Sequence, residues 1–192
     1  DLHSFPTRRS SDLRFYTVRN GTTWIGEWAF YKCARMTSVS IPNSVTIIDK
    51  YAFRECKALT TLTIPNSVTR LGQGLFFKSG LTSISIPSSV TSIGESAFRD
   101  CSGFIDVYCD AESVPNTASN AFTASAVAST TLHVPASGMS FYRSREPWNY
   151  FGNIVTLEGE VAPEAFAYVD GIRYSFASSY ATVVAGNTQY TG

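Results

Sequence analysis

Four cysteines have the most varied chemistry in this 192-residue chain, because thiolates bind metals and form disulfides. Cys33, Cys56 and Cys101 each stand three residues after a phenylalanine, whereas Cys109 lies in an alternating apolar segment. No C-x-x-C or Cys/His pair has the spacing of metal ligands. We therefore expect buried thiols that act as small hydrophobic residues, with a Cys33–Cys56 disulfide and a metal site as the alternatives.

The histidines and serines give little sign of catalysis. One histidine, His3, lies in an unusual N-terminal segment, and the other, His133, lies in TLHVP, which alternates like a β-strand. We expect His133 to be an exposed strand residue, because a general base needs a partner. No serine stands in G-x-S-x-G, and Gly72-Gln73-Gly74 is too short for a phosphate loop. The sequence predicts no enzyme and no cofactor.

Acidic residues gather after position 100, at Asp100, Asp106, Asp110 and Glu112. Carboxylate oxygens are the ligands that calcium prefers, so a calcium site is an alternative here. A solvated acidic edge is the simpler interpretation, and we predict no metal site.

The charge balance limits the classes of partner. Lys plus Arg number 15 and Asp plus Glu number 15, so the formal net charge is zero. A balanced chain of this kind lacks the positive surface expected of a nucleic-acid-binding protein. No apolar run approaches the roughly 18 residues of a membrane-spanning helix. We expect that this chain neither binds nucleic acid nor inserts into a membrane.

A repeated unit of 22 or 23 residues must position these side chains. Met36–Ala58, Leu59–Gly80 and Leu81–Gly103 align with one another, and a partial copy precedes them from Ile25 to Cys33. A fixed period of this length predicts a solenoid, in which each coil buries its apolar face against its neighbours. The repeats occupy residues 14–103.

The first half of each unit predicts a short strand that ends at a proline. Apolar residues two positions apart, such as Val39 with Ile41, point to one face of the strand. The opposite face carries small hydroxyl side chains. The candidate binding residues on this outward face are Ser38, Ser40, Thr61, Thr63, Ser83 and Ser85, continued by Asp106 and Tyr108. Strand faces of solenoids form extended binding surfaces, although small hydroxyls also suit any exposed sheet.

The second half of each unit predicts a short helix. Ile48, Ala52, Phe53 and Cys56 stand at i, i+4, i+5 and i+8, which is a helical stripe. The expected fold is α/β and β-rich, a leucine-rich-repeat solenoid with one strand and one short helical turn in each coil. Leu75 and Ser79 replace an alanine and a cysteine in the shorter coil 59–80, so we expect that coil to pack less regularly.

The C-terminal half changes character twice. Residues 104–160 contain a degenerate repeat, and we expect Phe141, Trp148, Phe151 and Ile154 to form an aromatic cap over the open end of the core. Residues 161–192 begin with a linker and contain Asp170-Gly171 between alternating apolar residues, which predicts a β-hairpin. Ala181–Ala185 predicts a further strand.

The pattern L-x-x-[VIL]-x-I-P-x-S-V-T-x-[IL] followed by A-F-x-x-C resembles the BspA-like leucine-rich repeats of bacterial surface proteins. The resemblance covers roughly residues 18 to 160. It implies a secreted or surface-anchored module that binds a host or bacterial extracellular protein or glycan; a passive spacer is the alternative. The resemblance also implies that residues 161–192 begin a second region and that the chain is a fragment of a longer protein.

The first 13 residues, DLHSFPTRRSSDL, resemble the in-frame translation of a common sequencing adaptor. That resemblance implies a disordered artefact that has no function of its own.

Overall fold

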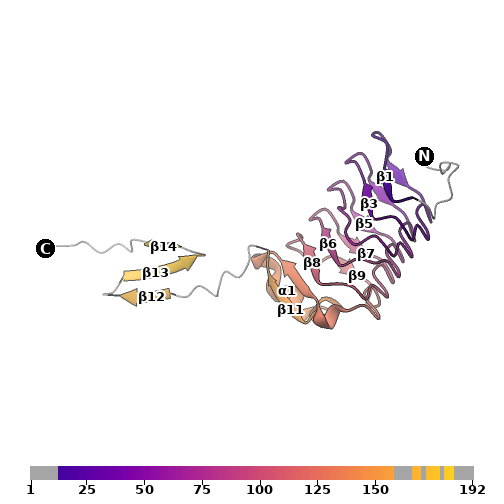
Figure 1. Cartoon of the computed structure of the whole chain (residues 1–192). Helices are drawn as coiled ribbons and strands as arrows, with labels where there is room; N and C mark the ends of the chain where they lie inside the picture. Colours follow the sequence, from indigo (N-terminus) through magenta and orange to yellow (C-terminus); the bar gives the residue numbers. More distant parts are fainter. Residues whose placement is uncertain (1–12, 158–165, 170–171, 178–179, 184–192) are drawn as a thin grey trace. The chain divides into compact units, whose positions relative to one another are not determined.

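A computed structural model describes residues 13–157, 166–169, 172–177 and 180–183 (Figure 1). The chain divides into two compact units, Asp1–Leu157 and Glu158–Gly192. The predicted artefact at residues 1–13 lies outside the described residues except for Leu13, as does the predicted linker at 161–164. No helix in the described part of the chain is long and apolar enough to cross a membrane.

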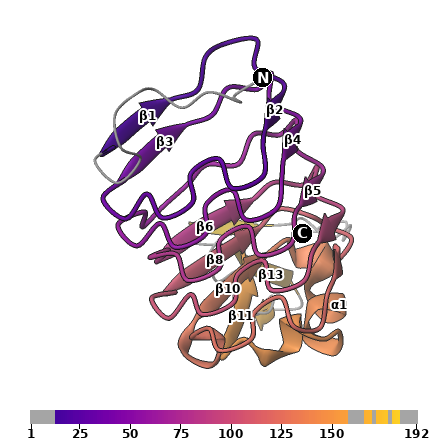
Figure 2. The same cartoon turned by 90° about the vertical axis from the view of Figure 1, so that its right-hand side faces the viewer.

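Six short strands, four of which the sequence predicted, form one side of a solenoid. They are β1 (Phe15–Thr17), β3 (Ser38–Ser40), β6 (Ser83–Ile86), β8 (Asp106–Cys109), β10 (Thr131–Val134) and β11 (Asn153–Thr156), and all pair in parallel. Strands β6, β8, β10 and β11 lie side by side in one four-stranded sheet (Figure 2), and β1 pairs with β3. We call these two groups, together with the strand segment of coil 59–80 between them, the first sheet. In β3, β6, β8 and β10 alternate residues are buried, as the two-residue period predicts.

Coil 59–80 interrupts this side of the solenoid. Its strand is reduced to a single parallel bridge between Thr63 and Ser85. The expectation of irregular packing is therefore right for the strand. It is wrong for the core, because Leu75 is fully buried and Ser79 is only 5% exposed.

The predicted short helices are absent, and a second parallel sheet begins where they were expected. Its two-residue strands are β2 (Trp24–Ile25), β4 (Ile47–Ile48), β5 (Arg70–Leu71), β7 (Ser92–Ile93) and β9 (Asn116–Thr117), in the spatial order β2-β4-β5-β7-β9. The coils that contain β1, β3, β6 and β8 thus also contribute a strand to the second sheet, whereas coil 59–80 contributes only β5 and the coil of β10 contributes none. Among residues 13–157 the only α-helix is α1 (Met139–Ser144).

Left-handed backbone conformations explain why the helical stripe does not form a helix. Tyr51 and Glu55 have φ values of 58° and 61°, and equivalent pairs recur in the neighbouring coils. A residue in this region cannot continue a right-handed helix. The backbone amides bond the next coil instead: Phe30 donates to the Ala52 carbonyl over 2.7 Å, and Phe53 donates to the Leu75 carbonyl over 3.0 Å. Because the turns are four residues apart, the buried residues Ile48, Ala52 and Cys56 have the same spacing in the sequence as the apolar stripe of a helix.

A column of phenylalanines runs through the core beneath these turns. Phe30, Phe53, Phe76, Phe98 and Phe122 are buried, and successive ring centroids lie 5.0, 5.7, 5.4 and 5.1 Å apart. The interplanar angles are 15° or less, so each ring stacks on the next. Such contacts between coils supply the burial that a single repeat lacks.

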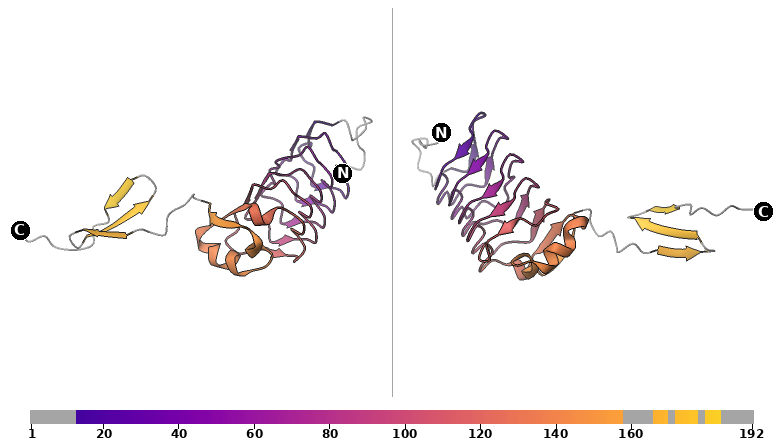
Figure 3. Two further views of the ribbon diagram at one scale, coloured as in Figure 1. Left: turned by 60° about the horizontal axis from the view of Figure 1, so that its bottom comes forward. Right: turned by 180° about the vertical axis from the view of Figure 1, so that it is seen from behind.

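The segment that contains α1 and β11 closes the C-terminal end of the coils (Figure 3). Buried aromatic side chains make this segment an aromatic cap. Trp148 is fully buried, its Nε1 donates to Thr117 Oγ1 over 3.0 Å, and Phe151 is 5% exposed. Ile154 packs against the same core. Phe141 was expected in the cap but is 57% exposed; its neighbour Tyr142 is buried instead. Residue 142 faces the coils because Tyr142 Oη donates to the Ala111 carbonyl over 2.7 Å.

The cap also contains three short 3-10 segments, Val127–Ser129, Ala136–Gly138 and Trp148–Tyr150. They replace the regular turns of the earlier coils, which is the degenerate repeat expected after residue 103.

The second unit contains an antiparallel sheet of β12 (Phe166–Val169), β13 (Ile172–Ala177) and β14 (Tyr180–Val183). Val169 pairs with Ile172, so the strands on either side of Asp170-Gly171 form the predicted hairpin, although these two residues lie outside the described part. The strand expected at 181–185 is present as β14, and residues 184 and 185 lie outside the described part.

Candidate binding surface

The eight predicted binding residues all lie on the outward side of the first sheet. The strand register places Ser83 beside Asp106 and Ser85 beside Tyr108, and the bridge places Thr63 beside Ser85. We call this surface the sheet face. Its members are Ser38, Ser40, Thr61, Thr63, Ser83, Ser85, Asp106, Tyr108 and, as described below, His133.

The hydroxyl groups of the sheet face differ from other hydroxyls of the repeats. Ser44, Ser67 and Ser89 donate to backbone carbonyls of the preceding coil, and so does Thr82. Within residues 13–157, none of the six sheet-face hydroxyls has a side-chain hydrogen bond to the protein. Except for the partly buried Ser83 they are exposed, so they are free to bond water or a ligand.

Three side chains gather where the sheet face reaches β8 and β10. His133 Nε2 lies 2.9 Å from Asp106 Oδ1, and the imidazole stacks on the Tyr108 ring with centroids 4.3 Å apart and planes 13° apart. The His133 side chain is only 19% exposed. His133 lies in a strand as expected, but the expectation of an exposed side chain is wrong.

Parallel strand pairing produces this cluster. His133 stands opposite Tyr108, and Thr131 stands opposite Asp106, so His133 lies diagonally from Asp106. The alternating pattern in TLHVP was the available signal, because it placed His133 on the outward row. The sequence did not show which strand would lie beside it.

The acidic residues do not form a metal centre. Asp106 is engaged by His133, and Asp100 Oδ2 lies 3.9 Å from Arg99 Nε. Among the described residues, no group of three or more His, Cys, Asp or Glu side chains could hold a metal ion. The calcium alternative therefore has no geometric support. Burial raises the pKa of the Asp110 carboxyl.

The cysteines are free thiols buried in the core, as the main prediction had it, and the Cys33–Cys56 disulfide is not formed. They also donate hydrogen bonds, which the sequence did not suggest. Cys56 Sγ donates to the Phe30 carbonyl over 3.1 Å, and Cys101 Sγ donates to the Phe76 carbonyl over 3.2 Å. Ser79, at the equivalent position, makes a different contact: its Oγ lies 3.4 Å from Cys101 Sγ, and either atom could donate.

Burial also keeps these groups in the protonated form. It raises the pKa of Cys33 and Cys109 to about 11 and that of Cys101 to about 12, and it raises the pKa of Cys56 further. Only the thiolate is an effective nucleophile or metal ligand. The cysteines therefore stabilise the coils and do not provide a reactive site.

The comparisons with known proteins agree with this architecture. No curated protein matches the chain significantly. A leucine-rich repeat protein from Bacteroides ovatus has 25% sequence identity and a TM-score of 0.54, over 64% of this chain and 32% of that one. The T. pallidum leucine rich repeat protein has 30% identity and a TM-score of 0.50, over 51% of this chain and 46% of that one. The chain thus spans less than half the length of either protein.

A family model of the BspA type leucine rich repeat region matches residues 23–144 with six copies. The match includes the first sheet from β3 to β10, the second sheet and helix α1. Since it covers more than half of the chain, the protein belongs to the BspA-type leucine-rich-repeat family.

Proposed function

We propose that this protein is a non-enzymatic binding module, secreted or held at a cell surface, whose sheet face binds an extracellular protein or glycan. The observation that carries the proposal is the set of exposed sheet-face hydroxyls without protein partners. The family resemblance supports the location and the class of partner.

The chemistry of the sheet face sets the expected mode of binding. Its hydroxyl rows carry no charge, and Asp106 is paired with His133. Recognition then depends on hydrogen bonds and shape, which salt screens much less than contacts between exposed charges. Tyr108 and His133 add a stacked pair of rings, and Tyr is a residue type enriched at interfaces.

A passive spacer is the second candidate function. The stacked phenylalanines link every coil from Phe30 to Phe122, which favours a stiff rod that holds other domains apart. A spacer requires no ligand on the sheet face.

Binding of the whole chain to an array of extracellular proteins and glycans separates the two candidates. Thr61, Thr63, Ser83 and Ser85 are changed together to lysine, which places bulky charges on the sheet face. We expect the variant to lose binding to every ligand that the wild-type chain retains at high salt.

A matched control adds four lysines at exposed positions on the turns beyond the prolines and beside the second sheet. These positions are Asn43, Asn66, Thr69 and Ser88. The control should bind as the wild type does. Equal affinity of the folded sheet-face variant would place the ligand elsewhere, and absence of binding by the wild-type chain would favour the spacer.

A further inference from the structure

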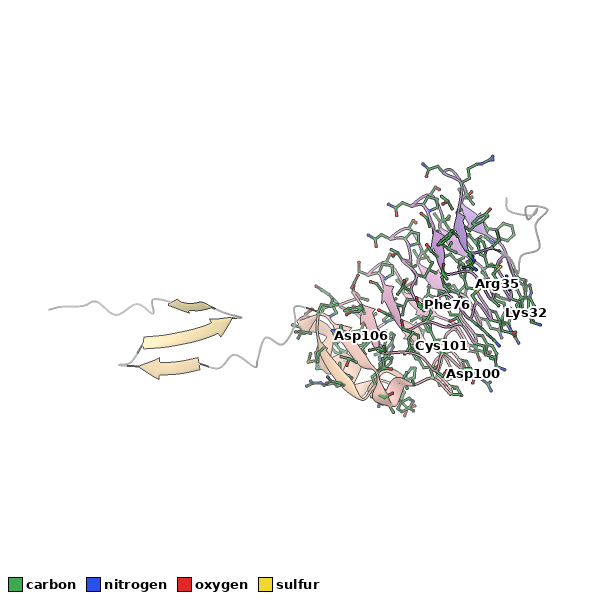
Figure 4. All side chains as sticks on the ribbon, viewed as in Figure 1. Lys32, Arg35, Phe76, Asp100, Cys101 and Asp106 are labelled. Atoms are coloured by element: carbon green, nitrogen blue, oxygen red, sulfur yellow. The ribbon has the colours of Figure 1, made fainter. Side chains whose placement is uncertain are left out.

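The stacked turns form a second long surface, which neither the sequence patterns nor the family match assigns to a function. We call it the turn edge: the outward residues of segments 28–35, 51–57, 74–79 and 96–102. Lys32, Arg35 and Asp100 belong to it. In Figure 4 these three residues lie towards one margin of the coil stack, with the core residues Phe76 and Cys101 between that margin and Asp106.

Aromatic rings cover the N-terminal half of the turn edge. Trp28 stacks on Tyr51 with ring centroids 4.3 Å apart, and it meets Tyr31 edge-on at 5.0 Å. Tyr51 lies over Gly74, where a Cβ atom would come within 2.3 Å of the tyrosine ring. Because Trp28 and Tyr51 each cover one face of the other and Tyr51 also lies over Gly74, few ring faces remain open to solvent.

Cations lie on these rings. The Arg54 guanidinium carbon lies 4.4 Å from the Phe77 centroid and between 5.7 and 5.9 Å from the rings of Trp28, Tyr31 and Tyr51. Lys32 Nζ lies 5.0 Å above Tyr31, and Lys78 Nζ lies 5.4 Å above Phe77. Contacts of this kind hold flexible cationic side chains in place, which reduces the entropy lost when they bind a ligand.

The turn edge concentrates positive charge in a neutral chain. Its four segments contain six lysines and arginines against two acidic residues, a net charge of +4, whereas the whole chain has a net charge of zero. Both carboxylates are paired, Glu55 with Arg54 at 3.3 Å and Asp100 with Arg99 at 3.9 Å. The surplus is carried by four exposed residues, Lys32, Arg35, Lys57 and Lys78.

The repeat fixes the spacing of these charges. Lys32, Glu55 and Lys78 occupy the same left-handed position in successive coils, with φ values of 56°, 61° and 57°. Strands in adjacent coils lie about 4.8 Å apart, so the backbones of Lys32 and Lys78 are about 10 Å apart along the solenoid. This arrangement fits a linear polymer with regularly spaced anionic groups better than a compact anion.

We propose that the turn edge binds an anionic polysaccharide, with sulfate or carboxylate groups on Lys32, Arg35, Lys57 and Lys78. A glycan needs only cations and hydrogen-bonding groups, and the edge offers both. Single-stranded nucleic acid needs a row of open aromatic faces for its bases, and here Tyr51 is covered by Trp28 and lies over Gly74, which leaves at most one open face on Trp28. An added peptide strand needs unpaired backbone amides, but the amides of Lys32, Glu55 and Lys78 already bond the next coil.

The test measures binding of the whole chain to heparin, with neutral dextran for comparison, at low and high salt. We expect binding to heparin but not to dextran, weakened by salt. The double substitution Lys32→Gln/Lys78→Gln should weaken heparin binding about tenfold. Arg19→Gln/Arg70→Gln is the matched control, because it removes two exposed cations away from the turn edge, and it should bind nearly as the wild type does.

A second measurement does not depend on the variants. Bound heparin should protect Lys32 and Lys78 from acetylation more than it protects Lys50, which is exposed but lies outside the turn segments. Equal losses in the two double variants, equal protection of the three lysines, or no binding to heparin would overturn the proposal. Tighter binding of poly-glutamate or of oligo-dT than of heparin through the same lysines would also overturn it, in favour of an acidic protein or a nucleic acid. The sheet-face lysine variant should retain heparin binding, so the two proposals fail separately.

Discussion

The sheet face and the turn edge are built from the same coils, yet they organise their side chains in opposite ways. On the hydroxyl rows of the sheet face, each side chain points outward alone, without a hydrogen bond to its neighbour in the next coil. On the turn edge, rings and cations contact one another across successive coils, as Trp28 does with Tyr51 and Arg54 does with Phe77. A repeat can therefore offer an open surface on one side and a preorganised one on the other.

The largest expected effect tests the core beneath the turn edge. Phe76→Ala removes one ring from the middle of the phenylalanine column and should lower the free energy of unfolding by about 3–5 kcal/mol. Phe77→Ala, one residue away, removes a partly exposed ring and should cost less than half as much. Urea denaturation of both variants measures the difference, and similar midpoints would show that the column does not hold the coils together.

The next effect tests the core beneath the sheet face. Ile64→Ala at an inward strand position should cost about 2–5 kcal/mol, because Ile64 is only 3% exposed. Thr63→Ala faces outward and should change the free energy of unfolding by less than about 0.5 kcal/mol. Equal costs in a denaturant titration would mean that the strand register of coil 59–80 is wrong.

The two sides of the coil were not equally predictable from the sequence. The strand pattern is unambiguous, because a two-residue period has only one common structural meaning, and Leu62, Ile64, Ile84 and Ile86 are buried as expected. The four-residue spacing of Ile48, Ala52 and Cys56 has two meanings, a helix or a pair of stacked turns. The decisive signal was Gly74, which has a φ of +58° where the neighbouring coils carry Tyr51 and Ser96.

Prediction of the candidate surfaces from the sequence was limited in the same way. The outward position of all eight sheet-face residues followed from the strand period, whereas the pairing of Asp106 with His133 joins residues 27 positions apart. The turn edge was not predicted, because Trp28 and Arg54 lie in segments expected to be helical and approach each other only across coils. Contacts between coils depend on register, which one sequence shows only where every repeat is regular.

A glycine provides a test at the junction where the turn edge leads into the sheet. A Cβ atom on Gly80 would lie 2.0 Å from the Lys57 carbonyl oxygen, which belongs to the preceding coil. Gly80→Ala must therefore displace backbone and should cost about 1–3 kcal/mol. Gly103→Ala is the matched substitution one coil later, where the nearest atom would lie at 3.3 Å, and it should cost less. The opposite order in thermal or urea unfolding would contradict the close approach in coil 59–80.

The smallest expected effect addresses the difference between the two surfaces directly. If the turn edge is preorganised by contacts between coils, then Arg54→Ala should lower the free energy of unfolding by about 1 kcal/mol, because an exposed ion pair and an exposed cation–π contact each contribute less than or about that amount. Ser85→Ala on the sheet face breaks no side-chain hydrogen bond and should stay within about 0.5 kcal/mol of the wild type.

A second pair of variants separates the contributions that the ion pair and the cation–π contacts of Arg54 make to the free energy of unfolding. Glu55→Gln removes the ion pair at 3.3 Å but leaves the guanidinium over Phe77, so it should cost less than Arg54→Ala. High salt should weaken only the part that Glu55 provides, since screening acts on exposed charges more than on a cation packed against a ring. If instead Glu55→Gln lowers the free energy of unfolding as much as Arg54→Ala does, the ion pair alone would account for the contribution of Arg54. The contacts of Arg54 with the aromatic rings would then add nothing to stability.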